Sequence, residues 1–166
     1  MLTAKPLSVW DARFCWRLAN EPSVRAASFD PAPPTPWGHC KWMMSWLFKS
    51  DRQAWVVSER IMLRLSSEPA DMFPGEFPLV PVSEPIGLAR IQRDGTIGIA
   101  TTHTQRQRGA GIFGVRIATE YAEDHGWGTP TARIKSDNGA SIGLFARAGY
   151  EMAEARDGMV VMEKRA

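Results

Sequence analysis

A short stretch between two predicted elements combines charged side chains with glycines. Between an apolar run typical of a strand and an amphipathic run typical of a helix, the chain reads Arg106-Gln107-Arg108-Gly109-Ala110-Gly111. Glycine has no Cβ to keep a ligand from the backbone, and the first turn of a helix offers unpaired N–H groups at the positive end of its dipole. Such a strand, turn and helix can hold a pyrophosphate. On their own, the two glycines are explained equally well as ordinary turn residues.

Two common nucleotide sites are excluded. The stretch does not end in Gly-Lys-Ser or Gly-Lys-Thr, as a P-loop does. It also lacks the Gly-x-Gly-x-x-Gly pattern that a ribose-binding acid follows about twenty residues later in dinucleotide-binding proteins.

Histidines and cysteines supply the remaining candidates for chemistry. His39 stands in a tryptophan-rich segment and is the candidate catalytic residue, whereas His103 is expected at the surface. Cys15 and Cys40 are predicted to be reduced and buried on apolar helix faces, which makes them poor nucleophiles. Two cysteines and three histidines without short paired spacing argue against structural zinc, and we expect no metal.

Helix and strand periods alternate along the chain, which predicts a mixed α and β fold. Apolar runs predict strands at residues 2–7, 54–58 with an extension through 61–65, 86–92, 96–102, 131–135 and 159–163. Apolar residues three or four apart predict helices at residues 10–20, 37–49, 109–125 and 141–148. Arg93-Asp94-Gly95 predicts a hairpin turn. Residues 66–85, which include five prolines, are expected to form one long loop.

Composition places the chain among ordinary globular proteins. It has 166 residues, 44% hydrophobic and 23% charged, so we expect a single domain spanning residues 1–166. The net charge of +2 is too small to indicate a nucleic-acid or membrane partner. Without a signal-like or membrane-spanning apolar run, we expect a cytoplasmic protein. Five tryptophans in the first third predict that this part is packed or lines a ligand: Trp10, Trp16, Trp37, Trp42 and Trp46.

Two motifs together resemble the GNAT acetyltransferases. Arg106-x-x-Gly109-x-Gly111 matches their Arg/Gln-x-x-Gly-x-Gly/Ala signature. The run from Asn138 to Tyr150 is similar to their second signature, Asn-x-x-Ser-x-x-Leu-Tyr-x-x-x-Gly-Phe. One predicted helix and one predicted strand lie between the motifs, as in the family. The resemblance covers about half of the chain, from Ile86 to Glu163.

The resemblance implies a fold and a co-substrate. The fold would be a central mixed, mostly antiparallel, twisted sheet that splays at the coenzyme site and has about four flanking helices. The pyrophosphate of acetyl-CoA would bind peptide N–H groups from Gln107 to Gly111, and the pantetheine arm would run beside the strand. Asn138 would reach that arm and Ser141 would cap the next helix, although Asn138 is nearly as well explained as a turn or cap residue. The implied coenzyme residues are Ile99, Ala100, Thr101, Arg106, Gln107, Arg108, Gly109, Ala110, Gly111, Asn138, Ser141 and Phe145.

The first third is similar, more loosely, to GNAT enzymes that acetylate amino sugars carried on nucleotides. The matching pattern runs from Trp16 to Phe29 and continues at His39-x-x-Trp42. The resemblance implies that this part forms the acceptor side, with polar groups from Asn20, Arg25 and Ser28 and with Trp42 as an apolar wall. Alternatively, the tryptophans fill the core and Arg25 is a solvated charge.

The mechanism implied by the resemblance is direct transfer of acetyl to an amine. A strand N–H near residues 100–102 would polarise the thioester carbonyl. Many family members have a tyrosine at the position of Phe145 that protonates the leaving sulfur, and phenylalanine cannot do this. Tyr150 is a poor geometric substitute. No carboxylate lies on residues 96–102, so the proton of the amine would be taken either by a relay of water molecules or by His39.

Three functions remain open. The leading one is an N-acetyltransferase for the primary amine of a small molecule, for example a nucleotide-linked amino sugar. A second keeps the chemistry but acts on a protein or antibiotic amine. A third is a coenzyme-binding regulatory module without turnover, which Phe145 would suit. Two chains could pair through their sheet edges as a homodimer.

Overall fold

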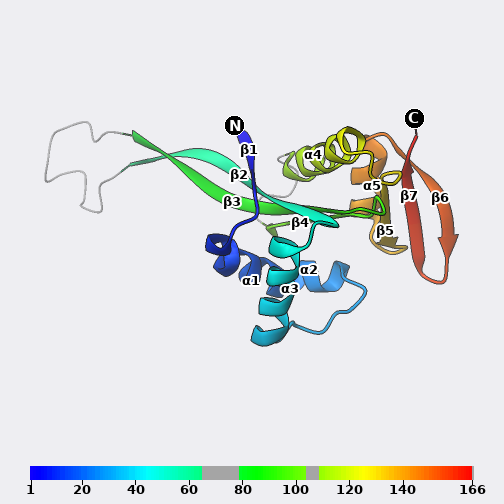
Figure 1. Ribbon diagram of the computed structural model, residues 1–166, viewed down its shortest axis with the longest axis horizontal. Helices are drawn as coiled ribbons and strands as arrows, with labels where there is room; N and C mark the ends of the chain where they lie inside the picture. Colours follow the sequence, from blue (N-terminus) through cyan, green and yellow to red (C-terminus); the bar gives the residue numbers. More distant parts are fainter. Residues whose placement is uncertain (65–78, 104–108, 166) are drawn as a thin grey trace, which may run out of the picture.

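Two sheets form the centre of the molecule in the computed structural model, which describes residues 1–64, 79–103 and 109–165. The first sheet is antiparallel, in the order β1 (Leu2–Pro6), β2 (Arg52–Arg64), β3 (Leu79–Gln92) and β4 (Ile97–Thr101). The second is also antiparallel, in the order β5 (Thr131–Lys135), β7 (Met159–Lys164) and β6 (Tyr150–Arg156). Figure 1 shows β2 and β3 continuing beyond the helices as a twisted two-stranded ribbon.

The two sheets meet at one point and separate from there. A parallel bridge joins Thr96, just before β4, to Thr131 at the start of β5. The N–H of Thr131 donates to the carbonyl of Gly95 at 2.9 Å. Beyond this bridge β4 has only β3 as a partner among the described strands, so its second edge is open. The expected mixed, mostly antiparallel and splayed sheet is confirmed.

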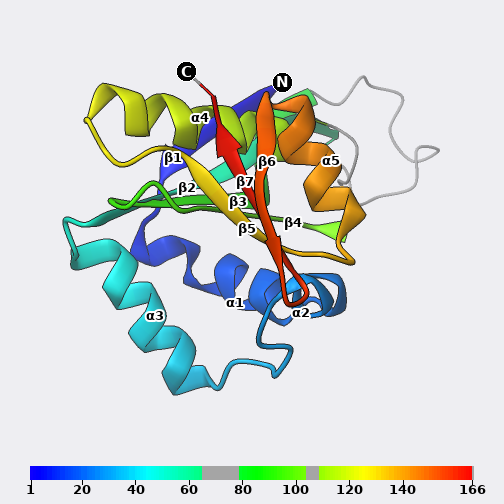
Figure 2. The ribbon, with the colours of Figure 1, turned by 90° about the vertical axis from the view of Figure 1, so that its right-hand side faces the viewer.

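Helices cover both faces of the first sheet (Figure 2). A 3-10 turn, Val9–Asp11, leads into α1 (Ala12–Asn20), and this helix lies with α2 (Pro22–Ala27) and α3 (Pro36–Phe48) on one face. On the other face lies α4 (Ala110–Asp124), and α5 (Gly139–Arg147) contacts α4 and the second sheet. Thr35 begins α3 by accepting a hydrogen bond from the N–H of Gly38 at 3.1 Å, and Pro36 occupies the first helical position, where no N–H is needed.

Alternate side chains of the first sheet enter two separate apolar layers. This follows from strand geometry, because successive residues point to opposite faces. On one face, Trp55, Val57 and Ala89 pack with α4. On the other, Val56 and Leu88 pack with residues of α1 and α3, namely Phe14, Cys15, Leu18 and Met43. The sheet therefore separates the first three helices from α4.

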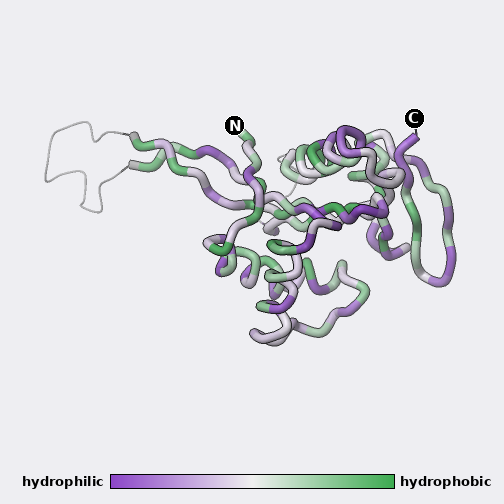
Figure 3. Tube along the Cα trace, viewed as in Figure 1, coloured by the Kyte–Doolittle hydropathy of each residue, from purple (hydrophilic) through white to green (hydrophobic). Residues whose placement is uncertain are grey.

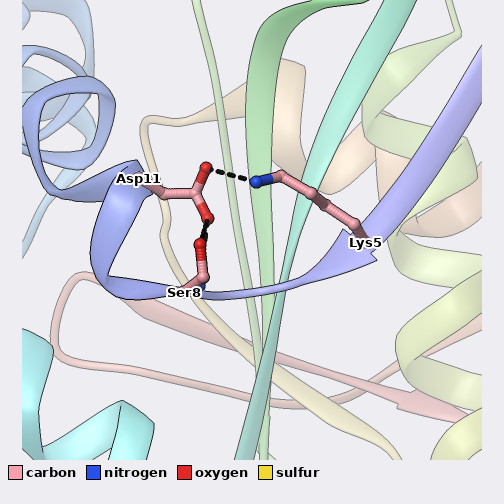
Figure 4. A network of polar contacts seen from close by, with 3 residues as sticks. All are labelled: Lys5, Ser8 and Asp11. Atoms are coloured by element: carbon pink, nitrogen blue, oxygen red, sulfur yellow. Dashed lines mark hydrogen bonds and ion pairs between the residues drawn. The ribbon is translucent and has the colours of Figure 1, made fainter.

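A buried carboxylate fixes the turn between β1 and α1 (Figure 4). Asp11 is 8% exposed, and one of its oxygens accepts from Lys5 Nζ at 2.7 Å. The other accepts from both the backbone N–H and the hydroxyl of Ser8, at 3.0 and 2.7 Å. Burial alone would raise the pKa of Asp11, but the hydrogen bonds from Lys5 and Ser8 outweigh it and lower this pKa.

Three features of the first half differ from the sequence-based expectation. Residues 79–85 belong to β3 and pair with β2, so the predicted loop over 66–85 was wrong there, and residues 65–78 lie outside the described residues. Prolines 81 and 85 are tolerated because this part of β3 has a partner on one side and an open edge on the other. Trp10 and Trp37 were expected to be packed or to line a ligand, but they are 89% and 68% exposed.

One helix and one strand were also not predicted, and one cysteine was wrongly predicted to be buried. Pro22 begins α2, a helix that was not predicted from the sequence. The strand β6 precedes a two-residue hairpin turn at Asp157 and Gly158, whose φ angles of 42° and 77° suit such a turn. Cys15 is buried as expected, but Cys40 is exposed, because it lies on the solvent side of α3. Both cysteines are free.

No helix in the ranges that the structure describes is long and apolar enough to cross a membrane. Figure 3 shows apolar segments along the outer part of the β2–β3 ribbon, where Met62 and Leu63 are exposed.

Candidate functional site

A cavity of about 230 Å³ lies between the first three helices and the first sheet. Its lining includes Arg25 of α2, His39 and Trp42 of α3, and Arg90 of β3. Ala100 of β4 also lines it, so the cavity reaches the strand whose second edge is open. Among the residues that the structure describes, the lining contains two guanidinium groups and one imidazole but no carboxylate.

Arg90 is fixed over the sheet by aromatic rings and by a glycine. It pairs across the sheet with Gly98, where a Cβ would come within 2.9 Å of the Arg90 Nη2 atom. The guanidinium carbon lies 5.6 Å from the ring centroids of both Trp42 and Trp46, an arrangement that stabilises a cation. Burial lowers the pKa of Arg90 from its ordinary value, but a guanidinium stays charged at neutral pH. Its Nε is buried without a hydrogen-bond partner.

Arg25 holds the loop that follows α2. Its Nη1 donates to the carbonyls of Asp30 and Ala32, at 3.3 and 3.0 Å, and its Nη2 donates to Ser28 Oγ at 3.2 Å. Its Nε is buried without a partner. Asn20 Nδ2 donates to the carbonyl of Trp16 at 2.9 Å. Of the four predicted acceptor-side residues, Arg25 and Trp42 line the cavity, whereas Asn20 and Ser28 make local bonds and are not part of its lining.

His39 is held between two tryptophan rings. Its ring centroid lies 5.3 Å from that of Trp16, edge to face, and 5.5 Å from that of Trp42, nearly parallel. Burial lowers the pKa of His39, and a hydrogen bond with the backbone of Ala12 offsets this only in part. The imidazole is therefore neutral at pH 7. Its Nε2 is buried and has no hydrogen-bond partner among the described residues, so this nitrogen is available to accept a proton.

Cys15 lines the same cavity but cannot act as a nucleophile near neutral pH. It is 2% exposed. Burial, and then the negative charge of Asp11, raise the pKa of its thiol to about 11. The reactive form of cysteine is the thiolate, which is negligible under these conditions.

The open edge of β4 presents free peptide groups. The N–H of Thr102 donates to Ile86 O at 2.9 Å, and the N–H of Gln92 donates to Thr96 O at 3.0 Å. Because antiparallel ladder bonds fall on alternate residues, the peptide groups at 96, 98, 100 and 102 face β3. Those of Ile99 and Thr101 therefore face the opening between the sheets. Side chains alternate as well: that of Ala100 lines the cavity, and that of Ile99 lies against α4 at Gly114.

The beginning of α4 has the geometry of an anion site. Gly109 precedes the helix with a φ of +83°, a value that favours glycine. The first bond inside the described helix runs from Phe113 N to Gly109 O at 2.9 Å, so the N–H groups of residues 110–112 have no acceptor within α4. A Cβ at Gly111 would lie 3.0 Å from the side chain of Leu144, so this glycine also lets α4 approach α5. Arg106, Gln107 and Arg108 lie outside the described residues.

The short helix α2 bridges the opening between the sheets. At its start, Glu21 Oε1 accepts from the N–H of His103, which follows β4, at 2.6 Å. At its end, the carbonyl of Ala26 accepts from Lys135 Nζ of β5 at 3.0 Å. Sequence reasoning missed this arrangement, because 82 and 109 residues separate the two pairs along the chain.

The comparison with protein families identifies the chain. Residues 2–151 match the family described as acetyltransferase (GNAT) domain. The chain belongs to this family. The relationship inferred from the two motifs is thereby confirmed, and so is the expectation of an acetyltransferase.

Solved GNAT structures share the fold at low sequence identity. A putative acetyltransferase from Salmonella typhimurium, solved with acetyl-CoA, has a TM-score of 0.71 and 15% identity over 98% of this chain and 92% of its own. A spermidine N-acetyltransferase from Vibrio cholerae, in complex with CoA and spermine, has a TM-score of 0.67 and 14% identity over 98% and 92%. An aminoglycoside acetyltransferase in complex with coenzyme A has a TM-score of 0.68 and 17% identity over 99% and 94%. No curated protein matches the sequence.

The second motif of this GNAT domain has mainly structural contacts in the described residues. Asn138 begins α5, because its Oδ1 accepts from the N–H of Ser141 at 3.1 Å. The cap of this helix is therefore Asn138, and the expectation that Ser141 would be the cap was wrong. Phe145 is 4% exposed and packs edge to face on Tyr150, with ring centroids 5.1 Å apart. The Tyr150 hydroxyl shares a hydrogen bond of 2.5 Å with Thr119, and burial raises the pKa of Tyr150 to about 12.

His103 is exposed, as expected. Among the described residues of the GNAT domain, no three His, Cys, Asp or Glu side chains come together in a group that could hold a metal.

Proposed function

We propose that this GNAT domain transfers acetyl from acetyl-CoA directly to the primary amine of a small molecule held in the cavity. The observation that carries the proposal is the open edge of β4, where the peptide groups of Ile99 and Thr101 have no strand partner in the described part of the chain. A thioester arm needs such hydrogen-bonding groups along its length. The adjacent Ala100 lines the cavity, so an amine there would lie beside the same strand.

The coenzyme would approach from the side of α4. Its pyrophosphate would bind the N–H groups at the start of this helix, which have no acceptor inside it and lie at the positive end of the helix dipole. The predicted contributions of Arg106, Gln107, Arg108 and Asn138 remain part of this proposal. Phe145 would contact the coenzyme only at its edge, because 4% of its surface is exposed.

His39 would accept the proton of the acceptor ammonium. It is neutral, it lines the cavity, and its Nε2 has no partner among the described residues. The amine would then attack the thioester carbonyl, and the N–H of Thr101 or Ile99 would stabilise the oxyanion. As the carbon–sulfur bond breaks, the attacking nitrogen would lose its second proton to water, and the leaving thiolate would take a proton from water, since Phe145 has no proton to give and the hydroxyl of Tyr150 is engaged with Thr119. A protonated Cys15 favours direct transfer over an acyl-enzyme intermediate.

A coenzyme-binding module without turnover is the second candidate. The engaged hydroxyl of Tyr150 and the buried Phe145 favour it, because neither supplies an acid for the leaving sulfur. Transfer to a protein or antibiotic amine also stays open. A single domain over residues 1–166, a cytoplasmic location, a homodimer and the lack of nucleic-acid, membrane or metal partners stay predictions.

Thermal unfolding with acetyl-CoA, together with thiol release, tests the proposal. A ligand that binds the folded state stabilises it by about 2.7 kcal/mol when present at 100 times its dissociation constant. We expect a rise in Tm that saturates with acetyl-CoA, and thiol release when an accepted amine is added. A rise in Tm without thiol release from any amine supports the regulatory module. No rise at millimolar acetyl-CoA would contradict both candidates.

A further inference from the structure

Two positive charges line the cavity without a negative charge to balance them. Arg25 comes from α2 and Arg90 from β3. They lie close enough for the charge of Arg25 to disfavour the charged form of Arg90. The lining contains neither Asp nor Glu, and no ion pair involves either arginine in the part of the chain that the structure describes. Both residues are half-buried, and charges withdrawn from water in proteins are normally paired, so this arrangement requires an explanation.

The same two arginines also have hydrogen-bond donors without a partner. The Nε atoms of Arg25 and Arg90 are both buried, and neither has an acceptor among the described residues. The terminal nitrogens of Arg25 are bound to the loop after α2, whereas no described residue accepts a hydrogen bond from Arg90. The guanidinium nitrogens of Arg90 are therefore all available to bind an acceptor, whereas in Arg25 only Nε is without a hydrogen bond.

The position of Arg90 is built into the fold. Trp42 and Trp46 flank its guanidinium, and Gly98 leaves room for it on the neighbouring strand. A guanidinium held in this way loses little freedom when it binds a ligand. Carboxylates and phosphates fit its fork through two parallel hydrogen bonds.

We propose that the acceptor is an amine that also carries a carboxylate or phosphate, and that this oxyanion binds Arg90, with the Nε of Arg25 as a second donor. The oxyanion balances the two guanidinium charges, which would otherwise repel the ammonium of the acceptor. A polyamine or an aminoglycoside has several positive charges and no oxyanion, so this cavity disfavours both. That the ligand is an amine to be acetylated rests on the proposed function, but that the cavity binds an oxyanion does not.

Pairs of amines that differ in one oxyanion test the proposal. The pairs are phosphoethanolamine and ethanolamine, glucosamine 6-phosphate and glucosamine, and L-leucine and L-leucinamide, with spermidine and kanamycin as polycations. Thiol release from acetyl-CoA gives kcat/KM for each. We expect at least one oxyanion member to exceed its partner by about ten- to a hundred-fold, the range of one hydrogen bond between charged groups. Preference for spermidine, kanamycin or the members without the oxyanion would overturn the proposal.

Variants of two arginines locate the discrimination. Arg90→Met should raise KM for the oxyanion member until the two members of a pair are used about equally, and Arg90→Lys should restore part of the difference. Arg52→Met is the matched control, because the Arg52 guanidinium lies 5.3 Å from the same Trp46 ring but does not line the cavity. Discrimination that survives in a folded Arg90→Met protein, or that is lost in Arg52→Met, would overturn the role of Arg90.

A titration of the wild-type protein separates this proposal from the proposed function. Tryptophan fluorescence is followed while inorganic phosphate or glutarate is added at constant ionic strength, without acetyl-CoA. A saturable change supports the oxyanion site even if no amine is acetylated, and it also decides the matter if Arg90→Met does not fold. No saturable change with either anion overturns the proposal. The proposal is also overturned if saturation with acetyl-CoA abolishes the change caused by phosphate, because the anion site would then belong to the coenzyme.

Discussion

At the scale of single residues, His39 combines a neutral ring with a nitrogen that has no partner. Its neighbours on both sides are tryptophans, so the surroundings favour the uncharged form. A general base must be uncharged before it accepts a proton, and a lowered pKa keeps it so over a wider pH range. The same burial keeps Cys15 protonated, so one apolar environment maintains both side chains in the form that suits the proposed direct transfer.

We predict that His39→Gln lowers kcat by about 10²- to 10⁴-fold, the usual contribution of a general base. Binding of acetyl-CoA, followed by thermal shift, should be unchanged. His125→Gln is the control, since His125 is exposed and stacks only on Tyr121.

In the wild type, kcat/KM should fall with decreasing pH only below 6.5, the ordinary pKa of histidine, because the pKa of His39 is lowered. A fall that begins above 6.5, or full activity in His39→Gln, would exclude this role.

Asp11 gives a prediction about stability. Asp11→Ala removes the carboxylate that binds Lys5 and Ser8, and it should lower the free energy of unfolding by about 1–2 kcal/mol in urea denaturation. The pKa of Asp11 is lowered in the folded state, so its contribution is complete above pH 3.8 and is lost as the pH falls through the folded value. Asp51→Ala, which removes an exposed partner of Arg52, should leave the denaturation midpoint nearly unchanged. Equal effects of the two substitutions would contradict this account.

At the scale of elements, β4 is the part on which the proposed chemistry depends. We predict that Thr101→Pro lowers kcat by about 10²- to 10³-fold, because it deletes an N–H that faces the opening and would stabilise the oxyanion. The fold should persist, since this N–H does not bond to β3 and proline is tolerated at open edges.

Ala100→Pro is the matched control for Thr101→Pro. The N–H of Ala100 faces β3, so its loss should lower Tm clearly more than Thr101→Pro does. Steady-state kinetics and thermal melting of both variants check the pair. Equal losses of Tm would show that the assignment of free and bonded peptide groups along β4 is wrong.

The sequence predicted the elements around the proposed coenzyme site better than those around the cavity. The hairpin at Gly95, the helix after Gly109 and the family itself follow from local signals, namely turn residues and short motifs. Arg90 gave no such signal, because an arginine within an apolar strand is noticed only when Gly98 and two tryptophans are seen around it. Contacts across long sequence separations define the cavity, and a pattern within one segment cannot show them.

At the scale of the whole molecule, the two sheets depend on one junction. Gly95 has a φ of +88°, and a Cβ there would lie 2.1 Å from the carbonyl oxygen of Thr129. Its own carbonyl accepts the bond from Thr131 that joins the sheets. A side chain at this position would push apart the two segments from which the splay begins.

We therefore predict that Gly95→Ala lowers the free energy of unfolding by about 2–5 kcal/mol, the sum of about 1–2 for the left-handed backbone and about 1–3 for the overpacking. Gly158→Ala is the control, because Gly158 has a φ of +77° but no atom within 4 Å of a new Cβ. It should lose only the backbone contribution. Urea denaturation of both variants checks the difference, and similar losses would mean that the junction tolerates a side chain.

The alternation of side chains along β4 has a consequence for how such a protein can change over time. Ala100 and Arg90 belong to one surface of the sheet, whereas Ile99 belongs to the other and packs near α4. Substitutions on the first surface can alter which amine is accepted and leave the second surface untouched. A single short strand thus allows selectivity to diverge while the donor half of the reaction is inherited unchanged.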